Sequence, residues 1–227
     1  MAAANVELHV AENHADLVGD LIAEQARAGG SIVLTGGTTP APAYRRAASV
    51  QPDWSSVTVW FGDERCVPPD DERSNYLLAK HNLLDLLERQ PNTVHRIRGE
   101  LQPADAAGEL DRALHSAELD LLLLGLGPDG HVASLFPGSP QLDVESHLAT
   151  SGPAGLEPWV DRVTMTMPAL LSARRIVVHV AGADKADAVA GAFGGGISRE
   201  IPASLLLQAP VPVEVWSDEA AAAKIRR

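Results

Sequence analysis

One segment of the chain joins an apolar run to residues that can move a proton. Leu121–Leu124 is uninterrupted leucine, and Gly125–Gly130 then places glycines, a proline and an aspartate directly before His131. A short apolar run bounded by glycine is typical of a buried strand, and the residues that follow must turn at its carboxyl end. Ligands bind at this edge of open α/β sheets. Because an imidazole titrates near neutral pH, we predict that His131 is a general base.

Two aspartates are candidate partners for this imidazole. Asp129 lies two residues before His131, and Asp63 follows another apolar run, Val57–Phe61. A carboxylate can orient an imidazole and stabilise its protonated form. An aspartate beside glycine also commonly caps a helix or closes a turn, and a lone histidine is more often structural. The position at a strand's carboxyl end favours a catalytic group of His131, Asp63 and Asp129.

A second turn has the composition of an anion site. After a short apolar run the chain continues with Gly36, Gly37, Thr38, Thr39 and Pro40. Thr39 is placed to cap a helix and Pro40 to begin it. Glycines let backbone N–H groups approach an oxyanion, and the helix N-terminus adds a favourable dipole. No Gly-Lys-Ser/Thr follows, so the turn is not a nucleotide-binding P-loop, and an ordinary strand-to-helix turn remains the alternative.

Three turns of this kind follow predicted strands, at 36–40, 62–65 and 125–131. Parallel strands bring such turns to one edge of a sheet, so we expect them to meet in one crevice. Lys185 opens a predicted helix, and Arg162 precedes a predicted strand. Either cation can supply the positive charge that a phosphate needs, although an exposed surface position is their usual place.

Other chemistry is disfavoured by the context of each motif. Gly125–Gly130 matches the G-x-G-x-x-G spacing, but it lies mid-chain, contains Pro128 and is not followed by an uninterrupted helix, so we expect no nicotinamide cofactor. Ser134 does not lie in a G-x-S-x-G elbow and is not expected to be a nucleophile. Cys66 is expected to be a buried, inert thiol. No His, Cys and Asp spacing predicts a metal site.

Composition limits the class of protein further. The 227 residues are 45% hydrophobic and 21% charged, which is ordinary for a globular protein, and the net charge is -12. A chain this acidic, with no basic stripe, is not expected to bind nucleic acid. Its single cysteine allows no intrachain disulfide and favours the cytoplasm. With no signal peptide and no apolar stretch of about 18–20 residues, we expect no membrane association. We expect a monomer or a weak homo-oligomer.

Strands alternate with helices along the whole chain. This alternation predicts a three-layer α/β fold of the Rossmann-like type, with a mainly parallel sheet and helices on both faces. No linker divides the chain, so we expect a single domain over residues 1–227. The stretch 136–159, rich in Pro, Gly and Ser, is expected to be a long irregular loop. The expected strands are 6–10, 31–34, 57–61, 119–124, 162–167, 176–181 and 211–216; the expected helices are 12–28, 40–48, 74–87, 104–117 and 183–192, with a short C-terminal helix capped by Asp218.

In order and spacing, several segments resemble the 6-phosphogluconolactonase family over nearly the whole chain. They are Leu-Thr-Gly-Gly-Thr-Thr-Pro at 34–40, Phe-Gly-Asp-Glu-Arg at 61–65 with Ser-Asn-Tyr at 74–76, the glycine-rich segment at 125–138, and Arg-Val-Thr-Met-Thr at 162–166. The resemblance implies hydrolysis of a sugar-phosphate lactone without metal or cofactor. It implies that His131 activates a water molecule and that Asp63 and Arg65 line the site, Arg65 polarising or anchoring the substrate. The backbone of Gly36–Thr38, Arg162 and Lys185 would hold the 6-phosphate.

Two other functions deserve comparison with this one. Glucosamine-6-phosphate deaminases are similar in fold, but their pattern has Asn-Glu-Pro after the histidine, and the glutamate belongs to their ring-opening machinery. This chain has Leu-Phe-Pro at 135–137, which disfavours a deaminase or an aldose–ketose isomerase. A sugar-phosphate-sensing module without catalysis would need an output domain, and the chain has no spare segment for one; fold alone does not decide between these functions.

Overall fold

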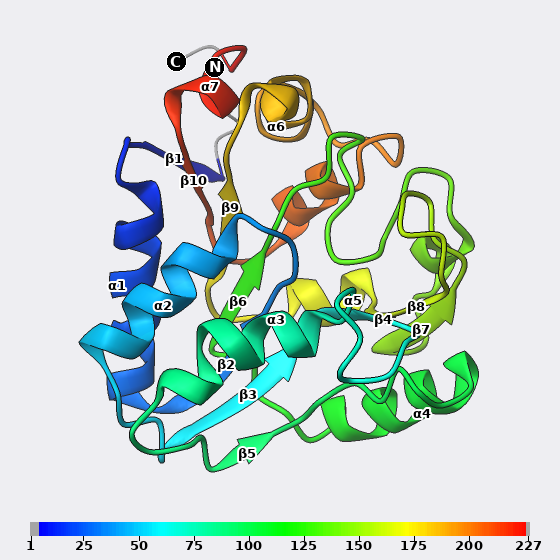
Figure 1. Ribbon diagram of the computed structural model, residues 1–227. Coiled ribbons are helices and arrows are strands. Elements are labelled where there is room, and N and C mark those ends of the chain that lie inside the picture. Colours follow the sequence, from blue (N-terminus) through cyan, green and yellow to red (C-terminus); the bar gives the residue numbers. More distant parts are fainter. Residues whose placement is uncertain (1–4, 226–227) are drawn as a thin grey trace.

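The computed structural model describes residues 5–225, and its main feature is a seven-stranded sheet in which every strand pairing is parallel (Figure 1). The strand order is β1-β10-β9-β6-β2-β3-β5. The strands are β1 (Val6–Val10), β2 (Gly30–Leu34), β3 (Val57–Phe61), β5 (Thr93–Val94), β6 (Leu121–Leu124), β9 (Ile176–Val180) and β10 (Val213–Ser217). This confirms the expected α/β class.

The order of the strands reverses between β2 and β6. From β2 the chain adds β3 and then β5 on one side, and it returns to place β6, β9 and β10 on the other. β6 and β9 are buried along their whole length, as is typical of central parallel strands; β6 is wholly apolar, and His179 is the one polar residue of β9. A reversal of this kind leaves a crevice outside the carboxyl ends of the two adjoining strands, here β2 and β6.

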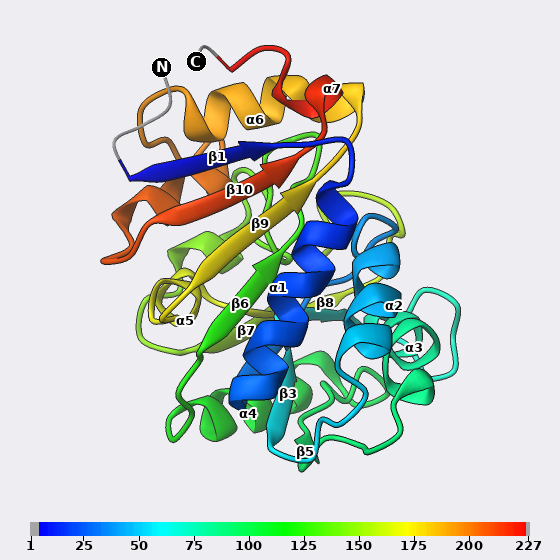
Figure 2. The ribbon, with the colours of Figure 1, turned by 90° about the vertical axis from the view of Figure 1, so that its left-hand side faces the viewer.

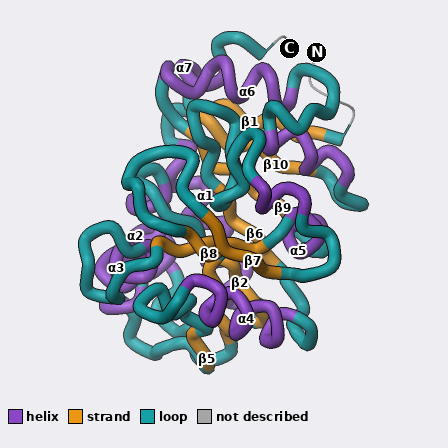
Figure 3. Tube along the Cα trace, turned by 90° about the vertical axis from the view of Figure 1, so that its right-hand side faces the viewer, coloured by secondary structure: helices purple, strands orange, loops and turns teal. Residues whose placement is uncertain are grey.

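Helices cover both faces of the sheet, as expected. Helices α1 (His14–Ala28) and α2 (Pro40–Val50) pack together on one face (Figure 2), and α4 (Pro103–Leu114) and α5 (Met167–Leu171) lie on the opposite side (Figure 3). The remaining helices are α3 (Asn75–Asn82), α6 (Ala186–Phe193) and α7 (Glu219–Ala222), with 3-10 turns at Leu84–Leu86, Pro140–Asp143, Ala183–Lys185 and Pro202–Gln208. No helix of residues 5–225 combines the length and the apolar character needed to cross a membrane.

A separate three-stranded antiparallel sheet differs from expectation. It has the order β4 (Asp63–Arg65), β8 (Arg162–Met165) and β7 (Ala149–Gly152). The stretch 136–159, expected to be wholly irregular, therefore contains a strand and a 3-10 turn. The sequence of β7 has no apolar run, and its ladder depends on pairing with β8, so local pattern could not reveal it.

Several helix boundaries also differ. Thr39 was expected to cap α2, but its backbone is already helical and its side chain makes no capping hydrogen bond. The helix expected over 74–87 ends at Asn82, and the one expected over 183–192 begins with a 3-10 turn. Asp218 caps α7 as expected, since its side chain accepts from the N–H of Ala221 at 2.8 Å.

Candidate active site

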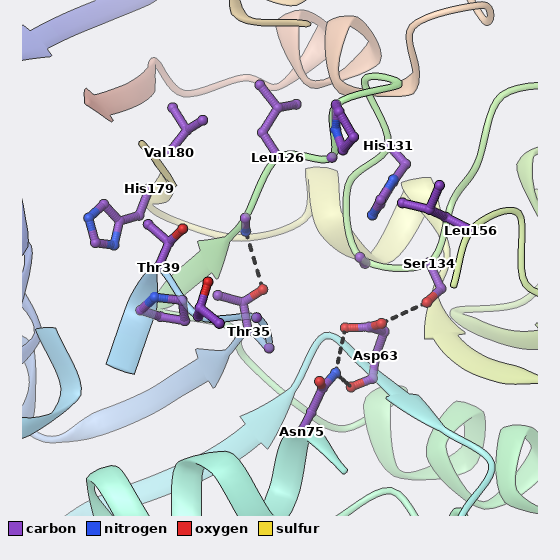
Figure 4. Close-up of a pocket in the computed structure, with 18 of the residues that line it drawn as sticks. Thr35, Thr39, Asp63, Asn75, Leu126, His131, Ser134, Leu156, His179 and Val180 are labelled. Atoms are coloured by element: carbon purple, nitrogen blue, oxygen red, sulfur yellow. Dashed lines mark hydrogen bonds between the residues drawn. The ribbon is translucent and has the colours of Figure 1, made fainter. Parts of the chain in front are cut away.

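A cavity of about 390 Å³ lies at the point where the strand order reverses (Figure 4). Its walls come from the turns after β2, β6 and β9, from β4, which directly follows β3, and from Asn75, Leu156, Glu157 and Arg162. The three expected segments therefore meet in one cavity, although the one expected as a turn at 62–65 is mostly the strand β4. Of the residues singled out from the sequence, those that line the cavity are Gly36, Gly37, Thr38, Asp63, Arg65, His131, Arg162 and Lys185; Asp129 lies behind the imidazole rather than on the wall.

The imidazole of His131 is held by Asp129. Its Nδ1 lies 2.6 Å from Asp129 Oδ1, which also accepts the backbone N–H of His131 at 3.2 Å. Burial raises the pKa of Asp129, but the hydrogen bond and charge of His131 outweigh it and leave that pKa below its usual value. An ionised carboxylate accepts only, so in the neutral ring we assign the proton to Nδ1 and the free lone pair to Nε2. This is the tautomer that a general base needs.

The backbone of the turn before His131 makes room for this pair. A Cβ at Gly127 would lie 2.0 Å from His131 Nδ1, and Gly130 has φ +84°. The N–H of Gly127 donates to the carbonyl of His131 at 2.9 Å, which closes the turn. Phe136 packs against the imidazole with ring centroids 4.5 Å apart. Glycine is thus required here by close approach and by a left-handed backbone.

Asp63 lines the cavity but does not touch the imidazole. Its Oδ2 accepts the hydroxyl of Ser134 at 2.6 Å, and its Oδ1 accepts the amide of Asn75 at 3.0 Å, as the dashed lines in Figure 4 show. The two aspartates considered as partners of His131 therefore have different positions. Asp129 is the carboxylate that contacts the imidazole ring. Asp63 instead contacts Ser134, in the turn that follows His131.

The turn after β2 presents backbone donors to the cavity. Within the described residues, the N–H groups of Gly36, Gly37 and Thr38 donate no hydrogen bond to the protein. Gly37 has φ +89°, and a Cβ at Gly36 would lie 1.9 Å from Asn75 Oδ1. The hydroxyl of Tyr44 accepts the N–H of Thr35 and donates to its carbonyl, which braces the start of the turn. Free N–H groups at a helix N-terminus form an anion site.

Three cations add positive charge to the cavity. Neither Arg65 nor Arg162 forms an ion pair with any described carboxylate, and the ammonium of Lys185 lies 3.5 Å from Asp184. Arg65 donates to the carbonyl of Arg73 at 2.5 Å. In a chain with net charge -12, two arginines at one cavity that form no direct ion pair with a described carboxylate favour an anionic ligand.

Arg162 also has a structural use that its sequence position did not reveal. It is 3% exposed, and its guanidinium donates to the carbonyls of Val160 and Pro158 at 2.9 Å and, more weakly, to that of Leu156. Burial, with the nearby charge of Arg65, lowers its pKa. These contacts fix the rim of the cavity formed by residues 156–160.

Sequence reasoning missed several residues of the cavity wall. Ser134 was considered only as a nucleophile, and His179 was set aside as the interior of a strand. His179 lies 2.8 Å from His14, and burial lowers its pKa to about 4. Its position near the carboxyl end of β9 was the feature of the sequence that could have indicated a place at the cavity. Asn75 belongs to the Ser-Asn-Tyr motif, but no pattern in the neighbouring sequence indicated that its side chain contacts Asp63.

Two further expectations concern reactive and metal-binding groups. Cys66 is half-buried rather than buried, and desolvation raises the pKa of its thiol to about 11, which agrees with an inert thiol. Residues 5–225 contain no group of three or more His, Cys, Asp or Glu side chains placed to hold a metal ion.

Comparison with known proteins identifies relatives of this arrangement. A 6-phosphogluconolactonase of Mycobacterium leprae is 36% identical over 216 residues, covering 88% of this chain and 87% of the relative. A 6-phosphogluconolactonase structure from Trypanosoma brucei superposes with a TM-score of 0.84 at 25% identity over all of both chains. A monomeric glucosamine-6-phosphate deaminase, at 20% identity and a TM-score of 0.85 over 97% of this chain and 99% of that one, shares the fold. Residues 2–215 match the model of glucosamine-6-phosphate isomerases/6-phosphogluconolactonase, and the chain belongs to that family.

Proposed function

We propose that this protein hydrolyses 6-phospho-D-glucono-1,5-lactone to 6-phospho-D-gluconate, a step of the oxidative pentose phosphate pathway. The observation that carries the proposal is that an imidazole hydrogen-bonded to a carboxylate and a set of backbone N–H groups with no acceptor among the described residues face one cavity. The lactonase relatives support the choice of substrate. A lactone is an activated ester, so one base and good positioning suffice without a covalent nucleophile.

The proposed reaction uses His131 twice. Nε2 takes a proton from a water molecule, whose oxygen attacks the lactone carbonyl at C1, and Asp129 stabilises the imidazolium that forms. The bond between C1 and the ring oxygen then breaks, and the imidazolium returns its proton to that oxygen. Asp63 belongs to the same site and acts on the turn that bears His131.

The phosphate of the substrate is assigned to the opposite end of the cavity. The N–H groups of Gly36, Gly37 and Thr38 and the ammonium of Lys185 would bind it, and Arg162 adds charge. Arg65 would polarise or anchor the lactone. Binding at the phosphate supplies remote energy that orients C1 at the base.

The deciding measurement is lactone hydrolysis by the wild-type protein. A pH-stat or a coupled-dehydrogenase assay on freshly made phosphogluconolactone should show enzymatic hydrolysis above the spontaneous rate. Glucosamine 6-phosphate serves as the comparison substrate, because a deaminase would release ammonia from it. Phe136, which is buried, stands where the deaminase pattern has its glutamate, so no ammonia is expected. Ammonia release without lactone hydrolysis would overturn the proposal.

The setting of the enzyme is part of the same proposal. We infer that it works in the cytoplasm as a single-domain monomer or weak homo-oligomer. Its single cysteine and the metabolic character of its relatives support this setting. Sedimentation at micromolar concentration tests the oligomeric state.

A further inference from the structure

The turn that bears His131 contains a strained residue. Ala133 has φ +49°, and no other non-glycine residue in the described part of the chain has a positive φ. An L-residue in this region brings its Cβ too close to its own carbonyl oxygen, which costs free energy. Such a conformation persists only where the surroundings over-determine it, and it is found mainly at functional sites. Ala133 itself lines the cavity.

The next residue, Ser134, is fixed from two directions. Its backbone N–H donates to Thr164 Oγ1 at 3.1 Å, and its hydroxyl donates to Asp63 Oδ2 at 2.6 Å. Ser134 is 1% exposed and Asp63 8% exposed, so little of either residue is in contact with solvent. A hydrogen bond from a hydroxyl to an ionised carboxylate is about twice as strong as a neutral one. The strained residue is therefore followed at once by a strong anchor.

Asp63 is itself held rigidly. The amide of Asn75 donates both to its carbonyl, at 2.9 Å, and to its Oδ1, at 3.0 Å. The backbone N–H of Asn75 donates in turn to Glu64 Oε1 at 2.7 Å, and that carboxylate also accepts from Ser74 and Tyr76. Ser134 is thus tied to the start of α3 through groups that are almost entirely buried.

We propose that Ser134 is a positioning residue, whose hydrogen bond to Asp63 holds the strained turn at Ala133 and thereby places the imidazole of His131. We call the Ser134–Asp63 contact the latch. The inference rests on the proposed function, in which His131 is the base. It also accounts for Asp63, which belongs to the site without touching the imidazole.

The test removes the latch and compares it with a matched deletion. Ser134→Ala should lower kcat by about 10²-fold, the loss expected of a base displaced by about 1 Å, with KM near the wild-type value. The control is Ser31→Ala, which also deletes a buried hydroxyl with a hydrogen-bond acceptor, here the carbonyl of Glu118, but at the amino-terminal end of β2 and outside the cavity. That variant should keep kcat.

Two double variants separate positioning from general loss of structure. In a His131→Ala background, Ser134→Ala should cause no further loss of the residual rate, because it acts through the imidazole. In the Ser134→Ala background, Ala133→Gly should recover about tenfold in kcat, because glycine adopts this backbone without strain. An unchanged kcat in Ser134→Ala, or a further loss in the His131→Ala background, would overturn the latch.

A readout without turnover keeps this test distinct from that of the proposed function. The NMR resonances of the His131 ring should shift in Ser134→Ala and stay unchanged in Ser31→Ala. Ring resonances that are the same in Ser134→Ala as in the wild type would reject the latch. Absence of lactone hydrolysis by the wild-type protein would reject the proposed function and leave the NMR comparison to decide the latch.

Discussion

Two turns leave neighbouring parallel strands at the same edge of the sheet, and they are built in opposite ways. The turn after β2 consists of small residues, and its N–H groups at Gly36–Thr38 donate to nothing in the described protein. The turn after β6 is filled with internal contacts: Asp129 holds His131, and Asp63 holds Ser134. The N–H groups of the first turn have no acceptor among the described residues, and the side chains of the second hold one imidazole and the serine that follows it.

The difference teaches how binding and chemistry are divided at this site. Substitutions in the turn after β6 should change kcat, because they act on the base. Substitutions around the turn after β2 should mainly raise KM, because the donors and charge proposed there would bind the phosphate already in the substrate complex; the part of this binding that orients C1 should appear as a smaller loss in kcat.

The largest effect is expected from His131→Ala. Loss of the general base should lower kcat by about 10²–10⁴-fold while KM stays near the wild-type value. Steady-state kinetics on fresh lactone measure both constants. Wild-type turnover in this variant would show that another group activates water, and the proposed division would fail.

Asp129→Asn should have the next largest effect. The amide cannot stabilise an imidazolium and favours the wrong tautomer, so kcat should fall by about 10²-fold. Asp111→Asn is the control, since it alters a carboxylate beside another histidine, His147, at 3.3 Å. Equal kcat in the two variants would mean that the contact of Asp129 with the ring at 2.6 Å has no catalytic use.

Lys185→Ala tests the binding side of the comparison. Loss of one ammonium at the phosphate should raise KM by about tenfold and leave kcat within a few-fold. Lys224→Ala removes an exposed lysine that pairs with Asp187 instead, and should change neither constant. If KM for the lactone is the same in both variants, the phosphate binds elsewhere.

Gly37→Ala should give the smallest effect. A Cβ there meets nothing within 4 Å, so only the strain at φ +89° operates, and the free energy of unfolding should fall by about 1–2 kcal/mol. Gly138→Ala is matched, with φ +65° and equally open space but outside the cavity. Urea unfolding should give similar losses for both variants, and KM should rise only for Gly37→Ala.

Most strands of the parallel sheet could be predicted from the sequence because each has a recognisable local pattern. β6, β9 and β2 are short apolar runs bounded by glycine or polar turns, and their carboxyl-end turns converge as parallel pairing requires. β7 was missed because its sequence, Ala-Thr-Ser-Gly, carries no periodic signal. A strand whose own apolar side chains form part of the core can be recognised from its sequence. A strand that forms only because it pairs with a neighbouring strand cannot.

The contacts within the site were less predictable than its location. The contact of Asp129 with His131 spans two residues and follows from sequence proximity. The hydrogen bond from Ser134 to Asp63 spans 71 residues. It joins the segment after β6, a strand of the large sheet, to β4, a strand of the small sheet, so no spacing rule could anticipate it. The three hydrogen bonds of Arg162 to the rim are likewise set by the path of a loop with no regular pattern.

The direct pairing of β2 with β6 has a consequence for ligand size. Ile32 and Val33 are in register with Leu121 and Leu122, and the N–H of Gly125 donates to Thr35 Oγ1 just beyond the paired residues. Adjacent strands are about 4.8 Å apart whatever side chains they carry. Main-chain pairing therefore sets the distance between the bases of the two loops. Side chains in either loop can be substituted without changing this distance, and so without changing the size of the ligand that fits between the loops.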